Sequence, residues 1–414
     1  MIEVNRITLA NGLRVVHCKD ETTRMVALNV LYDVGARDEH PDHTGFAHLF
    51  EHLMFGGSVN IPDYDTPLQL AGGENNAWTN NDVTNYFLIV PAHNVETGFW
   101  LESDRMLGLA FTPESLEVQR QVVSEEFKQR CLNQPYGDLG HLIRAMAYRK
   151  HPYQWPTIGK ELSHIAEATM DEVRGFFYRY YAPNNAILAI TGGIGRDEAF
   201  ALAEKWFGDI PRRNVPKRCL PCEPPQTEER RLTVERDVPA DLLYMAFHMC
   251  DRHHPDYYVC DVLTDLLANG SSSRLPIRLV KQRRVFSAAD ACISGSIDAG
   301  LLQINGRLLP GVTFEQAEQA VWDELDRLCC EPVDAYELEK VRNKFESDQL
   351  FANMNYVDLA ANMALFELLG KAEDLNLEVE RYRSVRPEDI MRVAGQTFVR
   401  ENCCTLYYKR KGHE

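Results

Sequence analysis

Two histidines and a glutamate lie close together in the segment His48-Leu-Phe-Glu51-His52. If this segment is a helix, residues three and four positions apart share one face, so the two imidazoles and the carboxylate project toward one point. Imidazole nitrogens bind zinc readily, and a catalytic zinc site needs three protein ligands and one open position for water. A neighbouring carboxylate can take a proton from water that the metal activates. The spacing therefore predicts His48 and His52 as metal ligands and Glu51 as a general base.

The residues around this segment favour a helix. Thr44 precedes it and is a good helix cap, apolar residues follow at helical spacing, and Gly56 and Gly57 provide a stop. With 13 histidines and 61 acidic residues among 414, a His-x-x-acidic-His string is expected by chance roughly 0.06 times. The pattern therefore favours a metal site over a coincidence of surface histidines.

A third ligand must come from elsewhere in the chain. Residues 112–127 read as a second helix, which begins at a capping threonine and a proline and contains the neighbouring carboxylates Glu125 and Glu126. Val122 and Val123 share a face with Glu126, so Glu126 is expected to point to the packed side and Glu125 to solvent. Glu126 is the predicted third ligand, and Glu125 is the alternative.

The composition limits the class of protein and its partners. The chain has 414 residues, of which 45% are hydrophobic and 25% charged, as in folded proteins of two or more domains. The net charge of -17 opposes binding to nucleic acid. No apolar run is long enough to cross a bilayer and the N-terminal residues lack an export pattern, so we expect a cytoplasmic protein with no membrane partner. The 11 scattered cysteines fit a reducing compartment.

A proline-rich segment divides the chain. Five prolines fall within residues 211–225, a composition that the interior of a helix or sheet does not tolerate. We therefore predict a linker at residues 211–225 between a first half, residues 1–210, and a second half, residues 226–414.

The two halves have similar patterns. A helical segment followed by Asn185 and an apolar strand recurs near the end of the chain, at Asn402, with a constant offset. Residues 26–32 and 242–248 are both β-rich runs followed by a His-Pro pair and a helix. An Asn-Gly pair near the N-terminus predicts a tight hairpin and hence antiparallel strands. The expected fold class is α+β, with one duplicated unit in each half.

The segment His48 to His52 resembles the pitrilysin or insulinase family of zinc metallopeptidases, whose His-x-x-Glu-His order is the inverzincin signature. The resemblance covers nearly the whole chain and is strongest to the subfamily that includes the mitochondrial processing peptidase and related bacterial enzymes. The other segments that carry it are Asn11-Gly12-Leu13, Gly35-Ala36-Arg37, Gly72-Gly73, Asn76-Ala77-Trp78-Thr79 and Tyr181-Ala-Pro-Asn184-Asn185.

The resemblance implies an architecture. Each half is expected to be an antiparallel-rich sheet packed with helices, as in the metallopeptidase fold of LuxS and the mitochondrial processing peptidase (LuxS/MPP-like). The first half would hold Zn2+, and the homologous second half would hold no metal. Such chains associate in pairs, so the resemblance implies a homodimer or a heterodimer with a paralogous chain.

The resemblance also implies roles for single residues. The family's third ligand lies in a Val-hydrophobic-x-x-Glu pattern, which selects Glu126. The family commonly has a second glutamate seven residues earlier, where this chain has Gln119, so a charge that could orient water or tune the metal is absent. The segment 76–79 resembles the family's edge strand, to which the substrate adds as another strand. The predicted substrate-binding residues are therefore Asn76, Ala77, Trp78 and Thr79.

The second half departs from the family pattern. Family members carry an Arg and a Tyr, seven residues apart, that bind the substrate backbone, and these positions fall on Val280 and Ser287. The neighbouring Arg278 and Phe286 have the wrong spacing, and Phe286 has no phenol. A related partner chain could supply the pair, and a homodimer with different contacts is equally compatible.

Together these features predict a zinc-dependent endopeptidase or oligopeptidase that hydrolyses peptides or unfolded polypeptides, with Glu51 as general base. The alternative is a non-catalytic or partner-dependent subunit of the same family, because some members keep the fold and lose the chemistry. The intact His48, Glu51 and His52 favour the enzyme.

Overall fold

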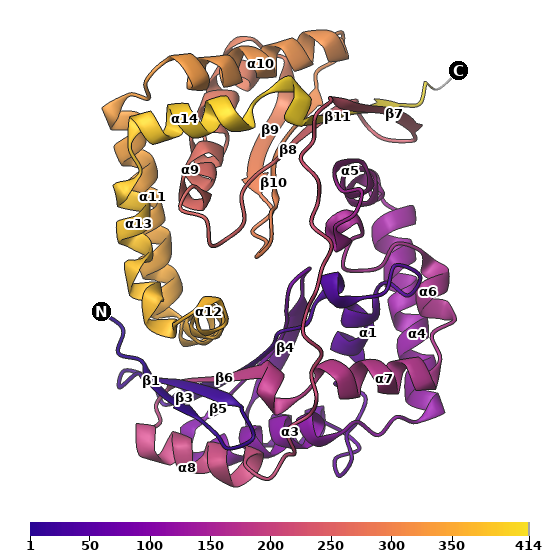
Figure 1. Ribbon diagram of the computed structural model, residues 1–414, viewed down its shortest axis with the longest axis vertical. Helices are drawn as coiled ribbons and strands as arrows, with labels where there is room; N and C mark the ends of the chain where they lie inside the picture. Colours follow the sequence, from indigo (N-terminus) through magenta and orange to yellow (C-terminus); the bar gives the residue numbers. More distant parts are fainter. Residues whose placement is uncertain (413–414) are drawn as a thin grey trace. The chain divides into compact units, whose positions relative to one another are not determined.

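The structure, a computed structural model, describes residues 1–412, which form two compact units (Figure 1). Unit 1 comprises residues 1–132, 151–221 and 350–377, and unit 2 comprises residues 133–150, 222–349 and the chain from residue 378 onward. Each unit combines one β-sheet with helices, which confirms the predicted α+β class. No helix within residues 1–412 is long and apolar enough to cross a membrane.

Unit 1 contains a six-stranded sheet in the order β1-β2-β6-β3-β5-β4. Its strands are β1 (Asn5–Thr8), β2 (Arg14–Lys19), β3 (Met25–Tyr32), β4 (Glu74–Thr79), β5 (Thr84–Pro91) and β6 (Ala186–Gly192). Neighbouring strands are antiparallel except β2 and β6, which are parallel. Gly12, between β1 and β2, has a φ of 93°, a left-handed conformation that favours glycine. The predicted hairpin is therefore confirmed.

The sheet of unit 1 is a middle layer, because both of its faces are covered. In β3 the side chains of Val26, Leu28 and Val30 belong to one core cluster, and those of Ala27 and Leu31 belong to another. Alternate residues of a strand point to opposite faces, so a strand covered on both sides reads as a continuous apolar run. The helices that contribute to the first cluster include α1 (Phe46–Leu53), α3 (Val95–Leu107), α4 (Pro113–Phe127), α7 (Met170–Tyr180) and α8 (Arg196–Phe207).

The opposite face of this sheet is covered by α12 (Tyr356–Leu369), a helix from late in the chain (Figure 1). Leu359 and Met363 of α12 join Val16 and Ile187 of the sheet in the second cluster. Several apolar side chains of α12 are therefore buried in unit 1. This assignment differs from the sequence-based boundaries, which placed all of residues 226–414 in the second half.

Unit 2 repeats the strand arrangement of unit 1 with one strand fewer. Its sheet has the order β7-β11-β8-β10-β9, and only β7 and β11 are parallel. The strands are β7 (Arg230–Arg236), β8 (Leu242–His248), β9 (Phe286–Ile293), β10 (Leu301–Leu308) and β11 (Cys403–Arg410). The helices are α5 (Leu139–Ala147), α9 (Tyr257–Leu267), α10 (Phe314–Cys330), α11 (Ala335–Met354), α13 (Glu378–Ser384) and α14 (Pro387–Thr397). The matching order shows two homologous halves.

The segment predicted as a linker has no helix or strand between residues 211 and 225. Its first part is fixed to unit 1 by two arginines. Arg213 donates to the carbonyl oxygens of Tyr181 and Leu107, and Arg218 pairs with Asp33 and Asp38. The segment is therefore extended but anchored, because charge-assisted bonds hold it.

Candidate metal centre

Helix α1 presents His48, Glu51 and His52 on one side, as the spacing predicts. The two imidazole rings lie 5.0 Å apart between centroids and are nearly perpendicular, at 85°. His48 is buried, whereas Glu51 and His52 are partly exposed. The helix thus places two nitrogen ligands beside a carboxylate that water can reach.

Helix α4 brings Glu126 to the two histidines. Its Oε2 lies 3.6 Å from Nε2 of His48 and 3.4 Å from Nε2 of His52, and the three candidate ligand atoms all lie within 4.8 Å of one another. Two ligands of a tetrahedral zinc at bond lengths near 2.05 Å are separated by about 3.3 Å. The two distances to Glu126 are close to that spacing, and the three atoms lie near enough to one another for the residues present to fit a zinc ion.

The environment of these groups also fits metal binding, since ligands must be deprotonated. Burial lowers the pKa of His48 to about 4, which keeps its imidazole neutral at pH 7. A hydrogen bond from His52 lowers the pKa of Glu126, which keeps its carboxylate ionised. Nδ1 of His48 is buried and has no hydrogen-bond partner within residues 1–412, so only its Nε2 faces a polar group.

The structure distinguishes Glu126 from its neighbour. The side chain of Glu126 is 20% exposed and faces the histidines, whereas that of Glu125 is 61% exposed and pairs with Lys128. Val122 is 45% exposed, so the prediction that Val122 lies on the packed side of the helix with Glu126 was wrong. The buried face of α4 centres on Val123 and its helical neighbours, and Glu126 lies at the border of that face.

Arg130 was not among the predicted site residues, and its Nη1 lies 2.9 Å from Oε1 of Glu126. The guanidinium of Arg130 thus pairs with the carboxylate oxygen of Glu126 that faces away from the histidines. Gln119, predicted to lie beside the ligands, makes no hydrogen bond to them within residues 1–412. The position of Arg130, four residues after Glu126 in sequence, was the available signal, since such pairs meet on a helix.

Glu51 is held from the edge strand of the sheet. The hydroxyl of Thr79, at the end of β4, donates to Oε2 of Glu51 at 2.6 Å. Burial raises the pKa of Glu51, which the Thr79 bond partly opposes. A carboxylate whose pKa is raised toward neutrality is better suited to accept and return a proton than an ordinary glutamate.

The predicted substrate-binding residues all lie in β4, at one edge of the six-stranded sheet. Their side chains alternate: Asn76 and Trp78 are exposed, whereas Ala77 and Thr79 are partly buried. The backbone N–H of Ala77 donates to the side-chain oxygen of Asn76 at 2.8 Å instead of to β5. This N–H therefore belongs to the open edge, where an added strand could bind it.

The N-terminus of α1 is capped differently from the prediction. Gly45 is the capping residue, with a φ of 87°, and Thr44 instead contacts Nδ1 of His164 at 2.8 Å. The carboxylate of Glu39 accepts the backbone N–H groups of Gly45 and Ala47, both at 2.9 Å. A buried carboxylate from the preceding loop thus satisfies the N–H groups that Thr44 was expected to satisfy.

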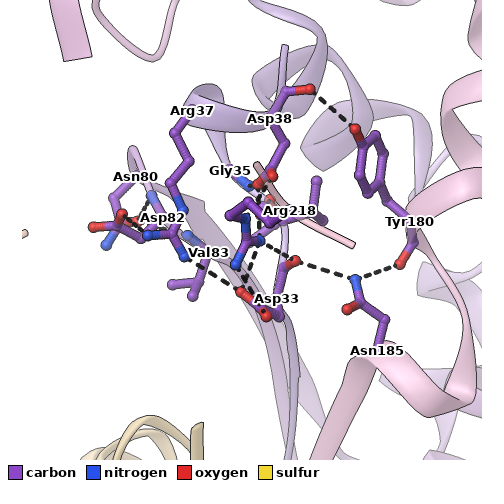
Figure 2. Close-up of polar contacts among 12 residues, drawn as sticks. Asp33, Gly35, Arg37, Asp38, Asn80, Asp82, Val83, Tyr180, Asn185 and Arg218 are labelled. Carbon is purple, nitrogen blue, oxygen red and sulfur yellow. Dashed lines mark hydrogen bonds and ion pairs between the residues drawn. The ribbon is translucent and has the colours of Figure 1, made fainter. Parts of the chain in front are cut away.

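The loop that carries Glu39 is braced against the β4–β5 turn (Figure 2). Nη1 of Arg37 lies 2.9 Å from Oδ1 of Asp82, and both side chains are buried. The backbone N–H of Arg37 also donates to the carbonyl oxygen of Asn81. On the other side of the loop, Arg218 holds Asp33 and Asp38. These bonds fix the start of α1 and the end of β4 to one another.

In unit 2 the positions of the family's Arg and Tyr are occupied as the sequence indicates. Ser287 donates to the carbonyl oxygen of Arg307 within the sheet, and Val280 is packed beside the core. The nearby Arg278 pairs with the buried Glu324 at 2.5 Å, and Phe286 is buried. Arg278 and Phe286 are therefore committed to the packing of unit 2.

Two sequence models of one peptidase family match the chain. The model described as insulinase (peptidase family M16) matches residues 14–161, and the model described as peptidase M16 inactive domain matches residues 167–345. The first range contains the whole His48, His52 and Glu126 cluster. The chain belongs to the pitrilysin/insulinase family.

Similar proteins of this family carry names that refer to proteolysis. A zinc protease, PqqE, from Helicobacter pylori is 28% identical over 411 residues, which are 97% of this chain and 92% of the relative. The beta subunit of the mitochondrial processing peptidase from Caenorhabditis elegans is 25% identical over 225 residues, 52% of this chain and 48% of the subunit. Membership and these names support a peptidase function, although the family also includes inactive domains.

Solved structures share the fold. The crystal structure of a protease from Helicobacter pylori has a TM-score of 0.92 at 27% identity and covers 99% of this chain and 100% of its own. The crystal structure of pitrilysin has a TM-score of 0.80 at 18% identity and covers 99% of this chain and 45% of its own. At that lower identity pitrilysin shows the fold alone.

Proposed function

We propose that the chain is a zinc-dependent endopeptidase or oligopeptidase. His48, His52 and Glu126 would hold the metal, and Glu51 would act as general base. The observation that carries the proposal is the convergence of three ligand atoms within 4.8 Å of one another beside a carboxylate of raised pKa. A structural zinc site would instead use four protein ligands and would not need an adjacent carboxylate that water can reach.

Zinc, when bound, acts as a Lewis acid that polarises a carbonyl and lowers the pKa of water. The chain's own contribution is the proton transfer. Glu51 takes one proton from the attacking water while the water oxygen bonds to the scissile carbonyl carbon. When the carbon–nitrogen bond breaks, the same carboxyl group returns the proton to the leaving amine. Thr79 and the surrounding helix keep Glu51 at the required place.

The substrate would bind along β4 in an extended conformation. An edge strand offers unpaired backbone groups, and a peptide that adds to it gains hydrogen bonds whatever its side chains are. The N–H of Ala77 lies on this edge, where a peptide would replace the side-chain oxygen of Asn76 that it now contacts, and the exposed side chain of Trp78 offers apolar contact. This mode suits peptides and unfolded polypeptides, because their backbone is free to become extended, whereas most of the backbone of a folded protein is not.

A second chain completes the proposed enzyme, as a homodimer or as a heterodimer with a paralogous chain. Val280 and Ser287 cannot supply the guanidinium and phenol that relatives use, and Arg278 is already paired with Glu324. A paralogous partner that carries both groups would supply them. Within the alternative function, the missing pair favours a partner-dependent subunit over a non-catalytic one. The cytoplasmic location stays a prediction.

The test combines metal analysis with cleavage of a mixed peptide library by the full chain. We expect one zinc per chain and cleavage that Glu51→Gln lowers by about 100- to 10,000-fold without loss of zinc. Glu117→Gln is the matched control, because Glu117 is an exposed acid on α4 that pairs only with nearby side chains. Zinc binding without cleavage, alone or with a paralogous chain, would contradict the proposal.

A further inference from the structure

Thr79 differs from the other residues of β4 in what its side chain contacts. It is the last residue of the strand, and its hydroxyl donates to Oε2 of Glu51 at 2.6 Å. The other oxygen of Glu51, Oε1, accepts no hydrogen bond from a group within residues 1–412. The two oxygens of the carboxylate are therefore in different situations, because one is held and the other is open.

The position of Thr79 is itself well fixed. Thr79 lies opposite Thr84 in the β4–β5 pair, and the hydroxyl of Thr84 donates to the buried carbonyl oxygen of Val34 at 2.9 Å. The next residue, Asn80, accepts the backbone N–H of Ala36. A threonine side chain is also stiff about χ1, because two heavy atoms branch from Cβ. The hydroxyl that holds Glu51 is thus attached to a braced turn.

A glutamate on a short helix would otherwise be free to turn. Its side chain has three rotatable bonds, and Glu51 is only partly buried, so solvent competes for both oxygens. Arg130 attracts the Glu51 carboxylate and Glu126 repels it through their charges, which act on both carboxylate oxygens. The bond from Thr79 is the direct contact that selects one orientation.

We infer that Thr79 is a positioning residue for Glu51: its hydroxyl fixes Oε2 so that Oε1 is left to take the proton of the attacking water. This inference rests on the proposed peptidase function. It gives Thr79 a role different from backbone binding of the substrate, because its side chain is already engaged. It also means that the strand that binds substrate and the base that acts on it are joined by one hydrogen bond.

The experiment compares Thr79→Val, which keeps the shape and removes the hydroxyl, with Thr79→Ser, which restores it. Zinc content, kcat and KM are measured for peptide cleavage by each full-length, zinc-loaded protein. Thr79→Val should lower kcat by about 10- to 100-fold, as expected for a misplaced reacting group, with KM and zinc content unchanged. Thr79→Ser should recover most of kcat. Crystal structures of the wild type and Thr79→Val should show the carboxylate of Glu51 turned away in the variant.

A matched control is Thr66→Val on α2 (Asp65–Leu70), which removes a hydroxyl–carboxylate bond of the same kind, to Asp63. It should leave kcat unchanged. An unaltered kcat in Thr79→Val, or a rise in KM alone, would overturn the positioning role while the peptidase function stands. If the wild type binds zinc and cleaves nothing, the peptidase function fails, and an unmoved Glu51 in the Thr79→Val structure would then overturn the positioning role separately.

Discussion

The two units use one arrangement of strands and helices for different chemistry. In unit 1, α1 follows β3, contacts the edge strand β4, and meets α4, which supplies Glu126. In unit 2, α9 follows β8, contacts the edge strand β9, and meets α11. Where unit 1 has two histidines and a carboxylate, unit 2 has Asp265 of α9 paired at 3.2 Å with Lys344 of α11, which also pairs with Asp348.

The difference shows what a metal centre requires beyond the fold. Partial burial lowers the pKa of Lys344, but the carboxylates of Asp265 and Asp348 outweigh it, so the lysine keeps its positive charge. That ammonium group satisfies the buried Asp265 without a metal. In unit 1 no lysine fills the corresponding place, and the two imidazoles face a carboxylate. The same scaffold therefore either presents a candidate cation site or supplies a cation from its own side chains.

The largest effect should come from the ligand on α4. Glu126→Gln removes a carboxylate ligand, and we expect zinc affinity to fall by at least about 100-fold, because even changes to groups behind the ligands cost 10- to 100-fold. Competition with a chelator of known affinity measures this change. Glu125→Gln is the matched control, since Glu125 is the neighbouring residue and points to solvent. A larger loss with Glu125→Gln than with Glu126→Gln would reverse the ligand assignment.

Zinc itself should stabilise only unit 1. Free zinc at 100 times its Kd should add about 2.7 kcal/mol to the free energy of unfolding of the unit that binds it. Hydrogen exchange can locate the change, and we expect new protection in α1, α4 and β4. The same experiment on Glu126→Gln, at the same zinc concentration, should show none. Protection of α9 and α11 to the same extent would show that zinc also stabilises unit 2, and would contradict the proposed difference between the units.

The third effect concerns the buried carboxylate that caps α1. Glu39→Gln loses one of the acceptors for the N–H groups of Gly45 and Ala47, and we expect a loss of about 1–3 kcal/mol in the free energy of unfolding, together with weaker zinc binding. Burial raises the pKa of Glu39 to about 8, so the charged form is costly, and the net loss should lie toward the lower end. Thermal unfolding and zinc titration measure both quantities.

Its control is Glu172→Gln on α7, where an exposed carboxylate accepts the backbone N–H of Thr169. That change should cost less and leave zinc affinity as it was, because α7 carries no candidate ligand. If Glu39→Gln and Glu172→Gln had equal effects on zinc binding, the cap would have no special connection with the metal centre.

Local patterns in the sequence predicted much of this molecule. The hairpin at Gly12, the strand β6, the duplicated segment that ends in β11, and the shared face of His48 and His52 each depend on a few neighbouring residues. Helical periodicity also predicted that Glu126 lies at the site. The exposed Val122 shows that the predicted buried face of this helix was only partly correct.

The features that were missed depend on contacts between separate segments. Glu39 replaces Thr44 as the source of the cap because a left-handed Gly45 and a preceding turn aim its carboxylate at α1, and no periodic pattern reports that. The bond from Thr79 to Glu51 requires the register of β4 beside α1. The transfer of α12 to unit 1 depends on which apolar face is left uncovered after each sheet has formed.

The smallest effect should be in unit 2. Lys344→Met leaves Asp265 buried without its ammonium partner, and the buried ion would normally cost several kcal/mol. The side chain of Lys344 is 43% exposed, however, so water screens the pair and we expect a loss of about 1 kcal/mol. Zinc affinity and cleavage should not change. Denaturant unfolding and zinc titration measure the two quantities.

The double variant Lys344→Met with Asp265→Asn distinguishes a lost ion pair from lost packing. If the unpaired charge of Asp265 causes the instability, its removal should restore part of the stability, and the two changes should not be additive. Lys340→Met serves as the control, because Lys340 contacts only the exposed Ser272. Additive losses of stability would show that the charge of Asp265 is not the cause of the instability. A change in zinc affinity with either variant would show that the ion pair of unit 2 affects the metal centre of unit 1. Either result would contradict the proposed difference between the two units.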